Sequence, residues 1–289
     1  MNKNAVNICV DAKMIEPAIV FLYSIFKTSP KFRKLDYIIC YDENQLKPSE
    51  LKPLVEFIDE YGGKAILVES IKNLPRGLIW KPTDHVSIAT YFRLFLPDHI
   101  YQEYERVLYF DVDMIAIGDI QSLLNENFVE PIAAVKHYSP LDEFRLKDLC
   151  DGEYFNAGVI VYNCEKMESN VIKKGYLDVL NRYQQRIKWH DQDVLNIYFS
   201  GKWHKLEEEY NCNKLLLKNL RDEIQPKLVH YDGWDKPWIS GVSREYDKLW
   251  KELYYEIFNE RHISSGPKAR IKQIVNKLKS KLKILIWHR

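Results

Sequence analysis

The alternation of apolar runs and amphipathic segments in the first seventy residues most limits the fold of this chain. Short apolar runs at residues 6–10, 35–41 and 65–68 read as buried strands, with helical patterns between them. Pro17 opens the first helix, and two glycines stop the second, which covers residues 49–61. This strand–helix–strand rhythm predicts an α/β fold with a mixed, mainly parallel sheet flanked by helices.

The remainder of the body continues the same kind of pattern but lacks a glycine-rich phosphate loop. Neither G-x-G-x-x-G nor G-x-x-x-x-G-K-[ST] occurs, which argues against a dehydrogenase or a P-loop nucleotidase. Nucleotidyltransferases need a glycine-rich loop after the first strand, and the segment CVDAKMI is not one. Further strands are predicted at residues 106–110, 132–135, 159–162 and 227–230, and helices at residues 171–183 and 194–199.

Two aspartates stand directly after the most hydrophobic of these strands. The strand RVLYF at residues 106–110 runs into Asp111, Val112 and Asp113. Ligands of open α/β sheets bind beyond the carboxyl ends of the strands. Two carboxylates at such a point repel each other unless a cation lies between them, and Mn²⁺ or Mg²⁺ with a diphosphate meets that need. A polar turn is the alternative explanation for an isolated D-x-D.

Composition and cysteine usage limit the class of protein. Hydrophobic residues make up 46% of the 289 residues, enough for a sizeable core. The five cysteines form no C-x-x-C pair, so neither a zinc site nor a disulfide framework is expected, and a reducing cytoplasm fits. The chain has no run of about 18 apolar residues and no signal-peptide pattern at its start, so we expect neither a transmembrane helix nor a leader.

Five ordered blocks surround the aspartates and carry a resemblance to a known family. They are SIATYFRLFLP, RVLYFDVDMI, EYFNAGVIVYN, HDQDVLN and HYDGWDKPW, and with the first strand they span residues 6–238. In these blocks the chain resembles the retaining glycosyltransferases of family eight, which include bacterial lipooligosaccharide α-galactosyltransferases and, more distantly, glycogenin. The resemblance implies a nucleotide-sugar-binding, Rossmann-like fold of the GT-A type.

The resemblance also implies roles for individual residues. The metal ligands would be Asp111, Asp113 and His230, with Mn²⁺ or Mg²⁺ as the ion. Catalytic residues around the donor sugar would be Asn156, Asp191 and Gln192. Residues that bind the UDP-sugar donor would be Asp11, Arg93, Asp111, Gly233 and Lys236, and the residue near the acceptor would be His85.

The implied reaction is α-linkage-forming transfer of galactose or glucose with retention, by front-face attack and with Gln192 beside the anomeric carbon. The relatives stack an aromatic residue on uracil shortly after the first strand. This chain has no aromatic residue there, so Met14 is a candidate to pack on the base instead.

A nucleotide-sugar-binding or self-glycosylating scaffold is the alternative function. Galactose and glucose cannot be separated, because they differ in the orientation of one hydroxyl.

The end of the chain differs from the body in charge. Residues 268–289 hold eight Lys and Arg and no acidic residue, whereas the remainder holds 34 basic and 41 acidic residues, a net charge of −7. We therefore expect a catalytic domain over residues 1–265 and a basic amphipathic tail over residues 266–289. Such a tail predicts attachment to an anionic membrane surface, the inner face of the cell membrane, where a glycolipid acceptor for surface glycan or lipopolysaccharide synthesis would be displayed. Docking on the acidic body is the alternative, and nucleic-acid binding is not expected.

Overall fold

The computed structural model describes residues 4–75, 87–138, 145–151, 153–213, 216–217, 224–233, 236–239 and 245–259. Contacts within the chain divide it into two compact units, residues 1–230 and residues 231–289. The two sheets lie in the first unit.

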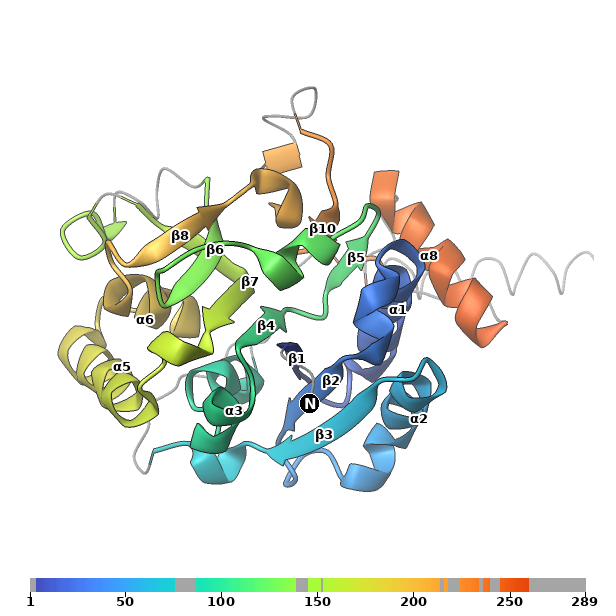
Figure 1. Ribbon diagram of the computed structural model, residues 1–289, viewed down its shortest axis with the longest axis horizontal. Helices are drawn as coiled ribbons and strands as arrows, with labels where there is room; N and C mark the ends of the chain where they lie inside the picture. The colour runs from blue at the N-terminus through green and yellow to red at the C-terminus, as the bar shows by residue number, and fades with distance from the viewer. Residues whose placement is uncertain are drawn as a thin grey trace, which may run out of the picture. The chain divides into compact units, whose positions relative to one another are not determined.

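The larger sheet of the first unit has seven strands in the order β3-β2-β1-β4-β7-β6-β8 (Figure 1). β7 runs antiparallel to both of its neighbours, and the other four strand pairs are parallel. The predicted α/β fold with a mainly parallel sheet is therefore confirmed. The strands are β1 (Asn4–Cys9), β2 (Asp36–Tyr41), β3 (Lys64–Glu69), β4 (Arg106–Phe110), β6 (Ile132–Lys136), β7 (Phe155–Asn163) and β8 (Trp203–Leu206).

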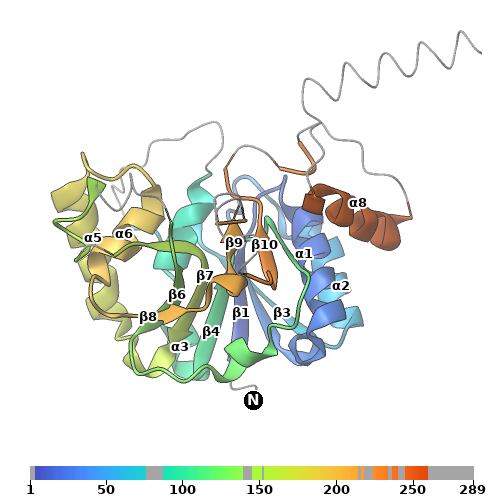
Figure 2. The ribbon, with the colours of Figure 1, turned by 90° about the horizontal axis from the view of Figure 1, so that it is seen from above.

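Helices cover both faces of this sheet (Figure 2). α1 and α2 lie over one face, where Phe21 of α1 packs edge-on against Phe110 of β4. α3, α5 and α6 lie over the other face, and Tyr109 belongs to the core on that side. Because successive strand residues point to opposite faces, a strand covered on both sides is apolar on both, as β4 is after its first residue, Arg106. The helices are α1 (Ile15–Thr28), α2 (Lys52–Glu60), α3 (Asp98–Glu103), α5 (Ser169–Tyr183) and α6 (His190–Tyr198).

A second, three-stranded sheet lies at the carboxyl end of β4. Its order is β5-β10-β9, with β5 at Met114–Ala116, β9 at Cys212–Asn213 and β10 at Leu228–His230. β10 pairs antiparallel with β5, which places His230 opposite Met114. The short sheet thus brings a residue from late in the chain beside the two aspartates that follow β4.

Most predicted elements are present, with shifted bounds. The helix predicted at 194–199 begins earlier, at His190, because the Asp193 side chain accepts hydrogen bonds from the backbone N–H groups of Lys188 and Trp189. The strand predicted at 159–162 extends over Phe155–Asn163. The segment predicted as a helix at 49–61 begins as a 3₁₀ turn, Pro48–Leu51, before α2. Sequence analysis did not predict the 3₁₀ helix Ile88–Leu94, which holds Arg93.

The second unit contains α8 (Glu245–Phe258). Trp250 of this helix is fully buried, and its ring lies 5.2 Å from that of Trp238. The predicted boundary at residues 265 and 266 and the basic tail lie outside the described residues. Within the described part of the chain, no helix has the length and apolar character needed to span a membrane.

Candidate active site

Two carboxylates and an imidazole converge where β4 gives way to β5. Asp111 and Asp113 occupy the turn between the two strands, and the pairing of β5 with β10 adds His230. His230 Nε2 lies 3.2 Å from Asp113 Oδ1 and 3.7 Å from Asp111 Oδ2, and one ligand atom from each residue lies within 4.8 Å of the other two. Two hard oxygen ligands and one nitrogen ligand form a donor set that fits Mn²⁺ or Mg²⁺.

One carboxylate oxygen of Asp111 accepts hydrogen bonds from two neighbouring side chains. Asp111 Oδ1 accepts a hydrogen bond of 2.6 Å from the Tyr109 hydroxyl and one of 3.0 Å from Arg93 Nη2. Asp111 Oδ2 is the oxygen that faces His230. The two donors fix the rotation of the carboxylate, so that Oδ2 is directed at the point where the three side chains meet.

Arg93 lies at the centre of this support and is 4% exposed. Its Nη1 donates to the Ala157 carbonyl oxygen at 2.6 Å, and its guanidinium lies over the Tyr109 ring, 4.0 Å from the centroid. Burial disfavours the charged form, but the carboxylates of Asp111 and Asp191 outweigh it and hold the pKa of Arg93 above its ordinary value. These contacts make Arg93 a buried cation that bridges two acidic side chains.

Asp191, at the start of α6, is the second carboxylate beside Arg93. Its Oδ2 lies 2.9 Å from Arg93 Nε, yet this N–H is directed at the Thr90 carbonyl oxygen. Among the described residues, no group donates a hydrogen bond to this buried oxygen. Desolvation by burial raises the pKa of Asp191 to about 7, and the attraction of Arg93 only partly opposes it. A buried acceptor without a donor is suited to bind a ligand hydroxyl.

We expect Asp191→Asn to stabilise the free protein in a pH-dependent way. Between its unfolded pKa near 4 and its folded pKa of about 7, the unfolded chain has released a proton that the folded protein retains. The wild type therefore loses stability as the pH rises through this window, and the amide does not. Above pH 7 the variant should be more stable by on the order of 4 kcal/mol, because each pKa unit corresponds to about 1.4 kcal/mol.

Urea unfolding of both proteins at about pH 4 and about pH 8 measures this difference. The two free energies of unfolding should be similar at the lower pH and should diverge at the higher pH. A constant difference between the proteins would show that the Asp191 carboxyl titrates normally in the folded state.

Gln192 and Asn156, the other predicted catalytic residues, are tied to the protein. Gln192 Oε1 accepts a hydrogen bond from the Ala157 N–H at 2.9 Å, and its Nε2 donates to the Tyr154 hydroxyl at 3.2 Å. Asn156 Oδ1 accepts a hydrogen bond from the Gly158 N–H at 2.9 Å. Each amide is thus fixed in orientation by a backbone donor.

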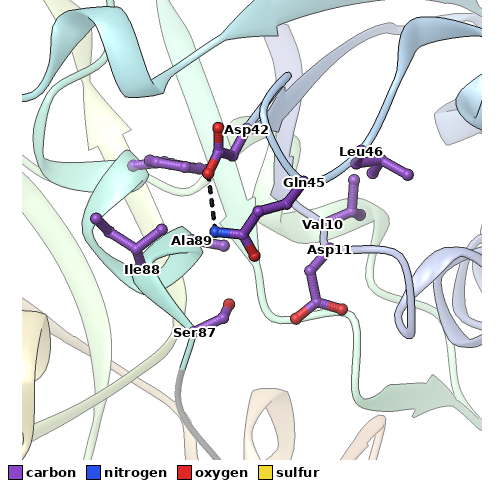
Figure 3. A pocket seen from close by; sticks show the side chains of 9 residues that line it. Val10, Asp11, Asp42, Gln45, Leu46, Ser87, Ile88 and Ala89 are labelled. Carbon is purple, nitrogen blue, oxygen red and sulfur yellow. Dashed lines mark hydrogen bonds between the residues drawn. The ribbon is translucent and has the colours of Figure 1, made fainter. Parts of the chain in front are cut away.

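A separate pocket opens at the carboxyl ends of β1 and β2, against the 3₁₀ helix that holds Arg93. Figure 3 shows the side chains of Asp11, Gln45 and Ser87 directed into the same space. The buried carboxylate of Asp42 accepts a hydrogen bond of 2.9 Å from Gln45 Nε2, which leaves the amide oxygen of Gln45 toward the pocket. Met14 is not one of the lining residues. These are Val10, Asp11, Asp42, Gln45, Leu46, Ser87, Ile88, Ala89 and Phe92.

The structure does not relate three of the predicted site residues to these side chains. Gly233 and Lys236 belong to the second unit, where Gly233 has φ +75° and Lys236 Nζ donates a hydrogen bond to the Tyr231 carbonyl oxygen. The positive φ suits glycine. His85 lies outside the described residues.

Two further residues, Tyr109 beside Asp111 and Trp189 before α6, were not predicted from the sequence. Tyr109 lies two residues before Asp111, and the twofold period of a strand was the available signal that both side chains share one face. Trp189 directly precedes α6 and is 43% exposed, an unusual position for so large an apolar side chain. No local pattern distinguishes an exposed tryptophan from a buried one.

The family follows from a comparison with known proteins. A sequence model described as glycosyl transferase family 8 matches residues 5–241. The chain belongs to glycosyl transferase family 8. This places it among the glycosyltransferases and confirms the resemblance carried by the five blocks.

The chain is also similar in sequence to individual curated proteins and in fold to solved structures. Lipopolysaccharide 1,3-galactosyltransferase of Salmonella typhimurium is 34% identical over 188 residues, which cover 60% of this chain and 54% of that protein. General stress protein A of Bacillus subtilis is 24% identical over 233 residues, 74% of this chain and 81% of that protein. The chain thus matches about half the length of the Salmonella enzyme. The galactosyltransferase LgtC, solved with donor and acceptor sugar analogues, shares the fold with a TM-score of 0.72 at 20% identity, over 87% of this chain and 95% of that one.

Proposed function

We propose that this chain is a metal-dependent, retaining hexosyltransferase that moves galactose or glucose from a UDP-sugar to a glycan or glycolipid acceptor. The observation that carries the proposal is the convergence of Asp111, Asp113 and His230 within 4.8 Å. Two carboxylate oxygens and an imidazole nitrogen facing one point form a ligand set for a divalent cation, and the imidazole favours a transition ion such as Mn²⁺. The hexose follows from relatives named as a galactosyltransferase and a glucosyltransferase of lipopolysaccharide.

In this proposal, the residues at and around the metal site stabilise the leaving group, orient Asp111 and bind the donor sugar. Asp111, Asp113 and His230 would hold a divalent ion, which would supply positive charge at the leaving diphosphate. Arg93 and Tyr109 keep Asp111 turned toward the ligand set. Asp191 Oδ2, buried without a hydrogen-bond donor among the described residues, accepts a hydroxyl of the donor sugar.

The pocket at the ends of β1 and β2 receives the nucleoside of the donor. The Asp11 carboxylate and the Gln45 amide oxygen are acceptors, and the N–H of uracil and the ribose hydroxyls are donors that match them. Apolar side chains of the lining, such as Leu46 and Phe92, offer surface to the base. In this proposal Gly233 and Lys236 hold the diphosphate, since glycine lets the backbone approach closely and lysine offers a point charge.

Retention of configuration proceeds by front-face attack in this proposal. The carboxamide of Gln192 is engaged at both ends by Ala157 and Tyr154, so it orients the sugar with Asp191 and Asn156 and is not the nucleophile. As the bond from the anomeric carbon to the leaving phosphate breaks, the acceptor oxygen bonds to that carbon, and its proton passes to the phosphate. An α-linked product without a covalent sugar adduct supports this route, and a sugar trapped on Asp191 would overturn it.

The acceptor is a glycan or a glycolipid of the cell surface. This part of the proposal rests on relatives whose names refer to lipopolysaccharide. Trp189, exposed directly before α6, offers an apolar ring to the face of an acceptor sugar. His85 is proposed as a further acceptor contact on the resemblance alone.

Donor hydrolysis tests the proposal without an acceptor. Purified protein is incubated with Mn²⁺ and a panel of UDP-, GDP- and ADP-sugars, and release of the nucleoside diphosphate is recorded. We expect slow consumption of UDP-galactose or UDP-glucose that stops with EDTA and returns with added Mn²⁺. Turnover that persists in EDTA would contradict metal dependence. Failure of every UDP-sugar both to bind and to react would contradict the function.

The basic tail is proposed to attach the enzyme to the cytoplasmic face of the membrane. Its eight Lys and Arg residues without acidic residues favour anionic lipid. We expect the full-length protein to sediment with vesicles of anionic lipid and not with neutral ones, and high salt should release it, because screening weakens exposed charges. Equal sedimentation with both vesicle types, or none, would contradict membrane attachment through the tail.

A further inference from the structure

A chain of buried amides runs from the backbone of β7 to the His230 ring. The Gly158 N–H donates to Asn156 Oδ1 at 2.9 Å, and Asn211 Nδ2 donates to the same oxygen at 2.8 Å. Asn211 Oδ1 lies 2.8 Å from His230 Nδ1. The three residues whose side chains form these hydrogen bonds are all buried: Asn156 is 7% exposed, Asn211 3% and His230 5%. Solvent therefore contributes little to their hydrogen bonding.

The backbone N–H at the start of this chain determines the direction of every bond in it. Gly158 N–H is a donor without ambiguity, so the atom of Asn156 that faces it is the oxygen. That oxygen needs a donor from Asn211, so Asn211 presents its NH₂ group to Asn156 and its oxygen to His230. An amide oxygen only accepts, so His230 Nδ1 carries a proton.

We infer that Asn211 is a positioning residue that holds His230 in the Nδ1–H tautomer, with Nε2 directed at the ligand set. Nε2 faces Asp113 Oδ1 at 3.2 Å and Asp111 Oδ2 at 3.7 Å. A neutral imidazole binds a metal through its unprotonated nitrogen, and the partner of the other nitrogen decides which one that is. The geometry places a proton on Nδ1 with or without an ion, and the consequence for metal affinity rests on the proposed metal role.

Burial makes this arrangement costly to reverse. In the opposite tautomer, Nδ1 would face the Asn211 oxygen at 2.8 Å with two acceptors and no proton between them. Rotation of the Asn211 amide would remove that clash but would set its NH₂ away from the Asn156 oxygen. A buried group left without its partner costs about 1–3 kcal/mol. The amide chain therefore keeps a proton on Nδ1 and leaves Nε2 as the nitrogen that a metal ion can bind.

Nitrogen NMR of histidine tests the tautomer itself, without metal. The protein is labelled with ¹⁵N-histidine and measured without metal, where Nε2 of His230 faces the carboxylates of Asp111 and Asp113. His230→Gln identifies the His230 signals. We expect Nδ1 of His230 to carry a proton in the wild type, whether or not Nε2 is also protonated toward Asp113, and a population with unprotonated Nδ1 to appear in Asn211→Ala. An unprotonated Nδ1 in the wild type overturns the inference.

Metal affinity tests the consequence for function. Mn²⁺ titration followed by electron paramagnetic resonance should show about 10- to 100-fold weaker binding in Asn211→Ala, as is usual for loss of a partner that orients a ligand. Asn211→Asp keeps an acceptor for Nδ1–H and should lose less affinity. Asn7→Ala is the matched control, because Asn7 is also fully buried, its Nδ2 donates to the Ile38 carbonyl oxygen, and it should bind Mn²⁺ as the wild type does.

The two measurements separate this inference from the proposed function. An Asn211→Ala protein that is folded and binds Mn²⁺ as tightly as the wild type overturns the positioning role. A wild type that shows the Nδ1–H tautomer but binds no Mn²⁺ supports the tautomer assignment and overturns the proposed metal role.

Discussion

Asp113→Asn is expected to lower the rate of UDP-hexose hydrolysis by about 1,000-fold, on the order of 4 kcal/mol of transition-state stabilisation. The amide keeps the size of the carboxylate and removes its charge. Asp113 Oδ1 is the oxygen that lies 3.2 Å from His230 Nε2. Loss of the Asp113 charge leaves Asp111 as the one charged ligand in the proposed set. Initial rates over a range of Mn²⁺ concentrations measure the effect.

Asp178→Asn is the matched control for this substitution. Asp178 lies on an exposed position of α5, outside the candidate site, and its replacement should leave both the rate and the Mn²⁺ dependence unchanged. If Asp113→Asn recovers full activity at high Mn²⁺, then Asp113 contributes affinity and is not required in the transition state. If Asp113→Asn equals the wild type at all concentrations, the proposed ligand set is wrong.

Gly158→Ala is expected to displace the His230 ring. A Cβ atom at Gly158 would lie 2.5 Å from His230 Cε1 and 2.8 Å from His230 Nδ1, and no real Cβ atom tolerates such distances. A ring displaced by about 1 Å would no longer point Nε2 at the ligand set, and misplacement of that size costs about 100-fold in rate. The overpacked core should also lose about 1–3 kcal/mol of stability.

A double-mutant cycle with His230→Ala shows whether the effect passes through the ring. In the His230→Ala protein the two contacts with the ring are gone and the contact with Asn156 Oδ1 at 2.9 Å remains, so adding Gly158→Ala should destabilise this protein less than it destabilises the wild type. Urea unfolding of the four proteins gives the coupling energy. Equal destabilisation by Gly158→Ala in both backgrounds would place the strain elsewhere in β7.

The elements of the fold could be predicted from sequence because hydrophobic periodicity is a local property. The apolar run RVLYF specified β4, since a strand covered on both faces needs no polar residue. The start of α6 was missed because its capping carboxylate, Asp193, lies inside the helix and receives N–H groups from residues before it. The 3₁₀ helix around Arg93 has no periodic signal of its own.

Within the candidate site, too, the residues that are close in sequence could be predicted and the long-range contacts could not. Asp111 and Asp113 are two residues apart, so the chain itself keeps them together after any strand that ends at Phe110. The family resemblance, and not local pattern, pointed to His230. Its meeting with the aspartates is decided by the register of β5 against β10, across more than a hundred residues.

The sequence by itself determined the α/β class, the order of most strands and helices, and the pair of aspartates at a strand end. Tertiary structure alone decided that Arg93 is buried between two carboxylates, that Asp191 keeps an oxygen without a hydrogen-bond donor among the described residues, and that Asn211 faces His230. The physical reason is range: propensity and periodicity act over a few residues. The direction of a side-chain hydrogen bond depends on which distant groups the packing of the sheet brings within about 3 Å.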